Sequence, residues 1–119
     1  MTEDMPRVEL KGLLPLVLVK TPTQKLYDRL MKIYEAGGWV GEDERLPTEK
    51  FALVGPTTHV LAMNYFDITD SPENYIRTDK ITVNEFCKRE NIDELKWGEI
   101  NKWFRYNKSN RLSLGQRLI

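Results

Sequence analysis

Apolar positions in the first part of the chain predict a buried strand. Residues 13–20 contain the longest apolar run, Leu13 to Val19, which is broken only by Pro15. A run this short is typical of a buried strand, because a membrane-spanning helix needs about 20 apolar residues.

A helix over residues 21–36 is predicted next. Thr21 has the position of an N-cap, Pro22 suits the first helical position, and Gln24 can complete a capping box. Apolar side chains then recur at helical spacing, at Leu26, Leu30, Ile33 and Tyr34. The pair Gly37-Gly38 ends the helix, since glycine accepts the left-handed conformation that is common after a helix.

The middle of the chain is rich in strand-forming residues. Residues 58–69 carry apolar side chains on both parities, which indicates a strand covered on both faces. A turn cluster at 70–74 separates them from residues 75–81. An antiparallel hairpin is the simplest pairing for two such segments.

Two further helices are predicted in the region 82–108. Thr82-x-x-Glu85 has the pattern of a capping box. Asn91 suits a left-handed turn, and Asp93 can cap the next helix. The sequence therefore predicts an α+β fold, with an N-terminal capped helix and a C-terminal helical pair packed against a small antiparallel sheet. The strands of that sheet are expected at 13–20, 58–69 and 75–81.

Length and composition indicate one domain. The chain has 119 residues, 40% hydrophobic and 30% charged, which is the balance of a globular protein. We expect a single domain over 1–119, with an α+β core at 12–90 and a basic, aromatic helical extension at 91–119. Eighteen Lys and Arg balance eighteen Asp and Glu, so the formal net charge is zero. That balance excludes a protein that binds polyanions through bulk positive charge.

The chain is poor in the residues that most enzymes use. It has one histidine, His59, in a predicted strand, and one cysteine, Cys87, on the apolar face of a predicted helix. These counts exclude an internal disulfide, a cysteine-rich zinc site and a metal site with two histidines. We therefore expect no enzymatic activity, no catalytic residue, no cofactor and no metal.

The N-terminal residues do not have the pattern of a signal peptide. Residues 1–5 include Glu3 and Asp4 in place of a basic cluster. Because the chain also has no apolar run long enough for a bilayer, we expect a cytoplasmic protein that does not bind membranes.

An acidic loop is the first candidate binding surface. Trp39 follows the glycine pair and precedes three consecutive acids, Glu42, Asp43 and Glu44. Such a loop can present negative charge to the basic cleft of a partner protein. We therefore take these four residues as candidate protein-binding residues.

A basic, aromatic segment at the C-terminal end is the second candidate surface. Residues 100–119 contain five basic residues and no acidic residue, a side-chain charge of +5. The candidate residues are Lys102, Trp103, Arg105, Tyr106, Lys108 and Arg111. Basic groups beside aromatic rings suit nucleic acid or an acidic protein surface. The alternative is that Trp103 belongs to the core and that the basic residues form a solvated helix face.

The span 82–104 also has the spacing of a helix–turn–helix. The residues that fit the packing pattern are Cys87, Asn91, Ile92, Trp97 and Ile100. The positions of the second helix that would meet DNA include Asp93, Glu94 and Glu99, whose charge opposes a phosphate backbone. A purely structural helix pair is the alternative interpretation.

Five short motifs within residues 17–90 combine cap and turn residues with apolar positions. They are Val19-Lys20-Thr21-Pro22-Thr23, Leu26-Tyr27-Asp28-x-Leu30-Met31, Gly38-Trp39, Pro47-Thr48 and Ile81-Thr82-x-x-Glu85-Phe86. In these motifs the chain resembles small phage- and prophage-encoded proteins, most of which have no assigned activity. The resemblance implies a non-catalytic accessory protein that binds a host or phage macromolecule.

These observations lead to one functional expectation and one alternative. We expect an accessory protein of a phage or mobile element that acts by protein–protein interaction, as an inhibitor or modulator of a host machine. Its expected partner is a host or phage protein. The alternative is a DNA- or RNA-binding regulator that uses the span 82–104 and the basic C-terminal end.

Overall fold

The chain folds into a small sheet covered by helices. The computed structural model describes residues 6–11, 16–62 and 65–118, with side chains described up to residue 107. The elements are β1 (Val17–Lys20), α1 (Gln24–Ala36), β2 (His59–Ala62), β3 (Phe66–Thr69), β4 (Asp79–Thr82), α2 (Val83–Arg89) and α3 (Glu94–Leu118). Two short 3-10 helices, η1 (Pro47–Glu49) and η2 (Pro72–Asn74), lie in the loops.

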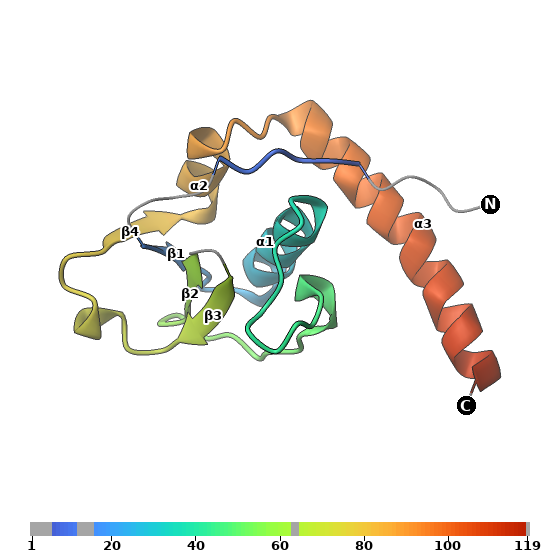
Figure 1. The fold of residues 1–119 in the computed structure, drawn as a ribbon, viewed down its shortest axis with the longest axis horizontal. Helices are drawn as coiled ribbons and strands as arrows, with labels where there is room; N and C mark the ends of the chain where they lie inside the picture. The colour runs from blue at the N-terminus through green and yellow to red at the C-terminus, as the bar shows by residue number, and fades with distance from the viewer. Residues whose placement is uncertain (1–5, 12–15, 63–64, 119) are drawn as a thin grey trace.

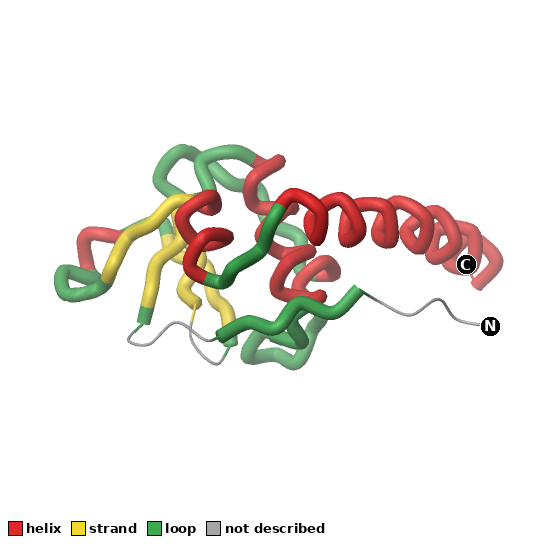
Figure 2. The backbone as a smooth tube through the Cα atoms, turned by 90° about the horizontal axis from the view of Figure 1, so that it is seen from above, coloured by secondary structure: helices red, strands yellow, loops and turns green. Residues whose placement is uncertain are grey.

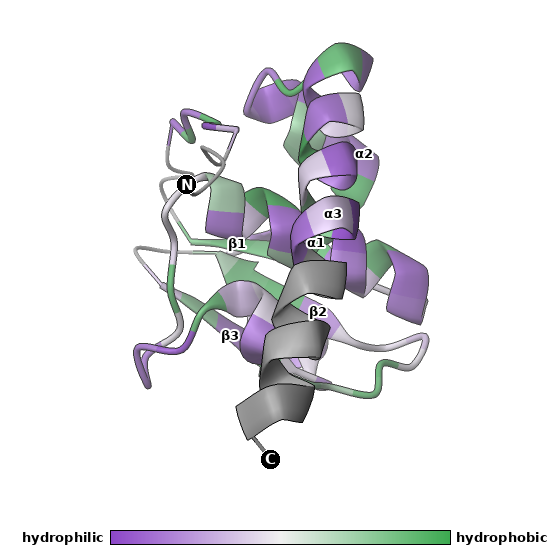
Figure 3. Ribbon diagram, turned by 90° about the vertical axis from the view of Figure 1, so that its right-hand side faces the viewer, coloured by the Kyte–Doolittle hydropathy of each residue, from purple (hydrophilic) through white to green (hydrophobic). Residues whose placement is uncertain are grey.

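The layers follow one another in the order sheet, α1 and α3 (Figure 1). Figure 2 shows the same order from above, with the strands at one end of the molecule and α3 at the other. Figure 3 shows β1 and β2 in hydrophobic colours, as expected for strands that lie inside the fold. The predicted α+β class is confirmed.

The sheet has four strands in the order β3-β2-β1-β4 and is mixed rather than antiparallel throughout. The central strand β1 pairs antiparallel with β2, where Val19 lies opposite Val60, and parallel with β4, where Val19 lies opposite Ile81. A parallel neighbour requires a long crossover between the two strands. Here α1 and the β2–β3 hairpin together form that crossover.

Two predicted strands are therefore placed or paired differently. The segment 58–69 forms a hairpin of β2 and β3, with Val60 opposite Ile68, instead of one strand. The segment 75–81 contributes β4, which pairs with β1 and not with 58–69. All four positions of β2 are buried, as predicted for a strand covered on both faces, whereas in β3 only Phe66 is buried. Residues 13–15 of the first predicted strand and residues 63–64 lie outside the described part of the chain.

The N-cap of α1 is Thr23, not Thr21. The side chain of Thr23 accepts a hydrogen bond from the Leu26 N–H at 3.2 Å. Thr21 is fully buried, and both its N–H and its hydroxyl donate to the Thr58 carbonyl, at 2.9 and 3.3 Å. The sheet therefore continues past β1 through Thr21, and the first available cap lies two residues later.

The predicted signals at the other helix ends are confirmed. Thr82 and Glu85 form the capping box of α2 in both directions, at 3.1 and 3.2 Å. Gly38 follows α1 with a φ of 83°, and Asn91 follows α2 with a φ of 60°. These left-handed residues turn the chain sharply after each helix.

The core joins the helices to the sheet. Ile92, Ile100 and Phe104 are buried in the same cluster as the sheet and α1, so the start of the predicted extension belongs to the folded body. The helical backbone then continues to Leu118, which is ten residues beyond the helix pair predicted at 82–108 and within the helical extension predicted at 91–119. At 1.5 Å per residue its 25 residues measure roughly 37 Å, and its C-terminal half extends away from the sheet and α1 (Figure 1).

The capping box gives a stability prediction. Thr82→Ala removes the acceptor for the Glu85 N–H, and we expect the free energy of unfolding to fall by about 1 kcal/mol. Urea unfolding of Thr57→Ala provides the control, because Thr57 is exposed in a turn and caps no helix. Equal midpoints for the two variants would show that the box adds nothing to stability.

Candidate functional site

A pocket of about 610 Å³ lies between α1, residues 47–53 and the middle of α3. Its lining residues are Gln24, Tyr27, Asp28, Met31, Lys32, residues 47–53, Phe104 and Arg105. We call it the α1–α3 pocket. Tyr27 and Met31 are each 1% exposed, and Phe104 is also buried, so these three residues give the pocket an apolar base.

Two polar ties hold the loop 47–54 along α1. At one end, the N–H and hydroxyl of Thr48 donate to the Glu35 carboxylate, near the end of α1. At the other end, the Val54 N–H donates to the side-chain oxygen of Gln24, the first residue of α1, at 3.4 Å. The loop is therefore fixed at both ends of the helix, and its middle forms one wall of the pocket.

Large apolar side chains on this loop are exposed at the pocket. Phe51 is 86% exposed and Leu53 is 84% exposed. Both line the α1–α3 pocket. Large apolar residues that gather beside a pocket with an apolar base mark an interaction site.

The Tyr27 hydroxyl is an unusual feature of this pocket. It is buried and has no hydrogen-bond partner among the described residues. Burial, and secondarily the negative charge of Asp28, raises the pKa of Tyr27 to about 12. The phenol is therefore neutral at physiological pH and can donate a hydrogen bond. A buried donor without an acceptor destabilises the free protein.

Cations surround the apolar base, and each already has a contact within the chain. Lys32 Nζ lies 3.3 Å from the side-chain oxygen of Asn101. Lys50 Nζ lies 3.8 Å from Asp43 Oδ2 and 5.2 Å from the centroid of the Phe66 ring. With Arg105, three basic residues line the pocket, and the acidic residues Asp28 and Glu49 line it as well, so its lining has one positive charge in excess.

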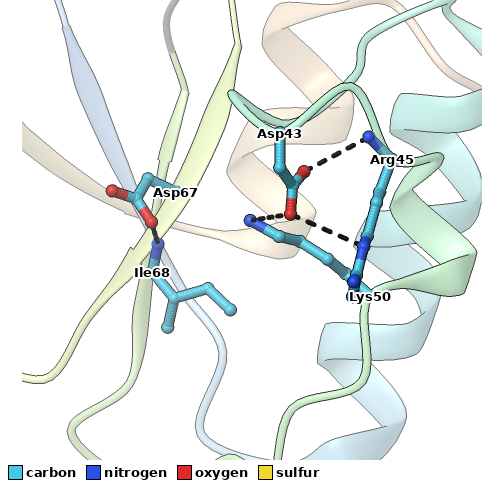
Figure 4. Close-up of polar contacts among 5 residues, drawn as sticks. All are labelled: Asp43, Arg45, Lys50, Asp67 and Ile68. Atoms are coloured by element: carbon cyan, nitrogen blue, oxygen red, sulfur yellow. Dashed lines mark hydrogen bonds and ion pairs between the residues drawn. The ribbon is translucent and has the colours of Figure 1, made fainter.

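The acidic loop is a fixed turn. The Glu44 N–H donates to the Gly41 carbonyl at 2.9 Å, and Glu44 has a φ of 64°. Asp43 accepts from the Arg45 N–H at 3.2 Å and lies 3.8 Å from both Arg45 Nε and Lys50 Nζ (Figure 4). The charge of Asp43 is therefore compensated within the chain, whereas Glu42 and Glu44 are exposed.

Trp39 has a different environment from the three acids. Its ring is 4.9 Å from the ring of Tyr34, and it packs half-buried against the core. The structure thus packs Trp39 against the core and leaves all three acids exposed, with Asp43 paired to basic side chains.

The exposed face of α3 carries part of the predicted basic surface. Lys102, Arg105 and Tyr106 are exposed, and their spacing of three and four residues places them on one face of the helix. Trp103 is half-buried, with its ring 4.7 Å from that of Phe104, so it belongs to the border of the core. The backbone at Lys108 and Arg111 is helical, and their side chains lie outside the described ones.

The left-handed turn of the predicted helix–turn–helix is present, but α3 packs mainly against α1, whereas α2 packs against β1 and β4. Cys87, Ile92 and Ile100 are buried, and Asn91 makes the left-handed turn. Trp97 is partly buried below Arg29, whose guanidinium carbon lies 4.8 Å from the ring centroid. Asp93, Glu94 and Glu99 are exposed at the start of α3, so its first turns present negative charge.

The two residues considered for catalysis have structural surroundings. His59 is 6% exposed, and its Nδ1 lies 3.1 Å from the Thr57 carbonyl oxygen. Burial raises the pKa of the Cys87 thiol, which favours the unreactive protonated form. In the part of the chain that the structure describes, no three His, Cys, Asp or Glu side chains gather at a metal site.

A second pocket, of about 1110 Å³, lies between residues 7–11, the end of α1 and residues 90–96. Its charged lining residues are Arg7, Glu9, Lys11, Glu35, Glu90 and Lys96. Three acids and three bases give it no preference for the sign of a ligand's charge. The α1–α3 pocket, with its exposed apolar residues, is the better candidate.

Comparisons with family models, with curated proteins and with solved structures give no match. No helix among the described residues is long and apolar enough to cross a membrane. Function is therefore inferred from the chain's own residues.

Sequence reasoning missed Tyr27, Phe51 and Leu53 as site residues. A signal was present, since the loop between Pro47 and Pro56 contains four apolar residues where loops are usually polar. Tyr27 is part of the apolar stripe of α1, and nothing in the sequence separates it from its neighbours in the core.

The Tyr27 hydroxyl gives a stability prediction with a pH dependence. We expect Tyr27→Phe to raise the free energy of unfolding by about 1 kcal/mol at pH 7, because it removes a buried donor without an acceptor. In the unaltered chain the pKa of Tyr27 is about 12 in the folded state and 10.0 in the unfolded state. Between pH 10 and 12 the unfolded state therefore loses the phenol proton first, and the free energy of unfolding falls as the pH rises. The advantage of Tyr27→Phe should therefore grow over that window, by up to about 1.4 kcal/mol per pH unit.

Urea unfolding of both proteins at several pH values between 7 and 12 measures this difference. The paired comparison cancels the titration of the other groups. If the Tyr27→Phe variant were less stable than the unaltered chain at pH 7, the conclusion that the Tyr27 hydroxyl has no hydrogen-bond partner would be wrong.

Proposed function

We propose that the chain is a non-catalytic accessory protein, of a phage or other mobile element, that binds another protein through the α1–α3 pocket and the adjoining face of α3. One observation carries this proposal: Phe51 and Leu53 are 86% and 84% exposed beside a pocket with an apolar base. The two polar ties at Thr48 and Val54 support it, because they hold this loop in place before any partner arrives. Such preorganisation reduces the ordering cost of binding.

The two exposed apolar side chains can supply a large part of the free energy that specific binding requires. Full burial of one Phe or Leu side chain contributes about 1.5–3 kcal/mol. Two such side chains supply about 3–6 kcal/mol of the roughly 8 kcal/mol that a micromolar complex requires. Contacts with the pocket base and with α3 would supply the remainder.

The acidic loop is the weaker of the two predicted protein-binding surfaces. Arg45 and Lys50 compensate the charge of Asp43, and Trp39 packs on Tyr34. Glu42 and Glu44 are left as its exposed charges. Binding to the basic cleft of a partner needs more uncompensated negative charge than this loop presents.

Selection of displayed random 16-residue peptides against the purified chain tests the proposed function. We expect enriched peptides to bind with a Kd of about 10 µM or tighter, and at least tenfold more weakly to a Phe51→Ser, Leu53→Ser double variant. Both positions are exposed, so serine leaves the fold intact.

The matched control is Ile76→Ser with Leu95→Ser, which removes two equally exposed apolar residues, 87% and 80% exposed, outside the pocket. Enriched peptides should bind this control as they bind the unaltered chain. Equal affinity for the two double variants and the unaltered chain would place binding elsewhere and contradict the proposal.

Nucleic-acid binding is the second candidate function. The exposed face with Lys102, Arg105 and Tyr106, on a helix that has no acidic residue after Glu99, favours it. The exposed acids at the start of α3 weigh against it, because they would oppose a phosphate backbone.

Fluorescence anisotropy with labelled single- and double-stranded DNA and RNA, at about 50 and 200 mM salt, tests this second function. If it holds, Lys102→Ala with Arg105→Ala and Lys108→Ala should lower affinity for all sequences alike and flatten the salt dependence. A triple alanine variant of the exposed Lys20, Lys25 and Arg77, which lie outside the span 82–104, removes the same charge elsewhere and should bind as the unaltered chain does. No binding at low salt would exclude this function.

A further inference from the structure

The basic face of α3 beside the α1–α3 pocket indicates the kind of protein segment that the pocket binds. We infer that the pocket takes an acidic amphipathic peptide segment of a partner protein, whose apolar side chains cover Phe51 and Leu53 and whose carboxylates face Lys50 and α3. This inference rests on the proposed function and adds the chemistry of the partner.

The apolar half of the inference follows from the shape of the surface. Phe51 and Leu53 are exposed on the loop, whereas Tyr27, Met31 and Phe104 form the base between the two helices. A segment with one apolar face can cover both sets at once, as amphipathic helices do in hydrophobic grooves. A wholly polar segment would leave Phe51 and Leu53 without apolar cover.

The acidic half follows from the charge along α3. Beyond the acids in its first turns, α3 carries only basic charged residues, among which Lys102 and Arg105 are exposed. Arg105 also lines the pocket, so the basic face of α3 and the pocket are continuous. A segment that lies in the pocket and continues along α3 is therefore complementary if it is acidic.

Lys50 connects the pocket with the acidic loop. It lines the pocket, and its Nζ lies 3.8 Å from Asp43 Oδ2 (Figure 4). In the free protein Lys50 is thus paired with Asp43, and an incoming carboxylate could contact the same ammonium group. Asp43 and the partner's carboxylate would compete for Lys50.

Three fluorescein-labelled 16-residue peptides test the inference on the full chain by anisotropy. The first is an amphipathic sequence of Leu and Glu, the second has Gln in place of every Glu, and the third has Lys in place of every Glu. We expect the Leu/Glu peptide to bind at least tenfold more tightly than the Leu/Gln peptide, and the Leu/Lys peptide to bind most weakly.

A single substitution in the chain sharpens this test. Asp43→Asn should raise affinity for the Leu/Glu peptide about two- to threefold and leave the Leu/Gln peptide unchanged, because it releases Lys50 from Asp43. The substitution Glu42→Gln is the control for Asp43→Asn, since it removes one exposed acid of the same loop and leaves the pair of Asp43 and Lys50 in place.

The outcomes separate this inference from the proposed function. Equal affinities for the Leu/Glu and Leu/Gln peptides, both lost in the Phe51→Ser, Leu53→Ser variant, would overturn the acidic partner and keep protein binding at the pocket. Affinities unaffected by that double variant would overturn both. Displacement of the Leu/Glu peptide by single-stranded DNA, or a dimer in sedimentation that the double variant dissociates, would show a different occupant and also overturn the inference.

Discussion

The ring of Tyr34, on α1, contacts aromatic rings from three separate parts of the chain. Trp39 lies 4.9 Å away at the start of the acidic loop, Phe86 lies 5.4 Å away on α2, and Phe66 lies 5.9 Å away on β3. Tyr34 is fully buried, and burial followed by the charge of Glu90 raises its pKa well above the usual value. Such ring contacts add to the energy of burial and fix the angle at which elements meet. The place of α1 on the sheet depends on this cluster, and the pocket exists because α3 and the loop 47–54 then pack on α1.

The sequence predicts local structure where one short signal decides it. The capping box of Thr82, the left-handed turn at Asn91 and the end of α1 at Gly38 depend on residues within one turn of each other. The N-cap at Thr21 was wrong because Thr58, 37 residues away, takes that threonine into the sheet. Strand pairing was wrong for the same reason, since the position of β4 beside β1 depends on contacts between distant residues.

The candidate site was predictable in part. The run of basic residues after Glu99 is visible in the sequence, and the structure places Lys102, Arg105 and Tyr106 on one exposed face. The pocket was not predictable, because it needs two long-range ties, from Thr48 to Glu35 and from Val54 to Gln24. The pairing of Asp43 with Lys50 could not be predicted from the sequence either. Because of this pair, the acidic loop is a turn whose central charge is compensated within the chain.

The α1–α3 pocket is the surface that we propose meets a partner, and NMR tests this most directly. Backbone amide chemical shifts of the full chain would be recorded during titration with the Leu/Glu peptide. We expect shifts in the loop 47–54, in α1 around Tyr27 and Met31, and in α3 around Phe104 and Arg105. Shifts confined to α2 and to β4, at the sheet edge opposite β3, would contradict the proposed surface.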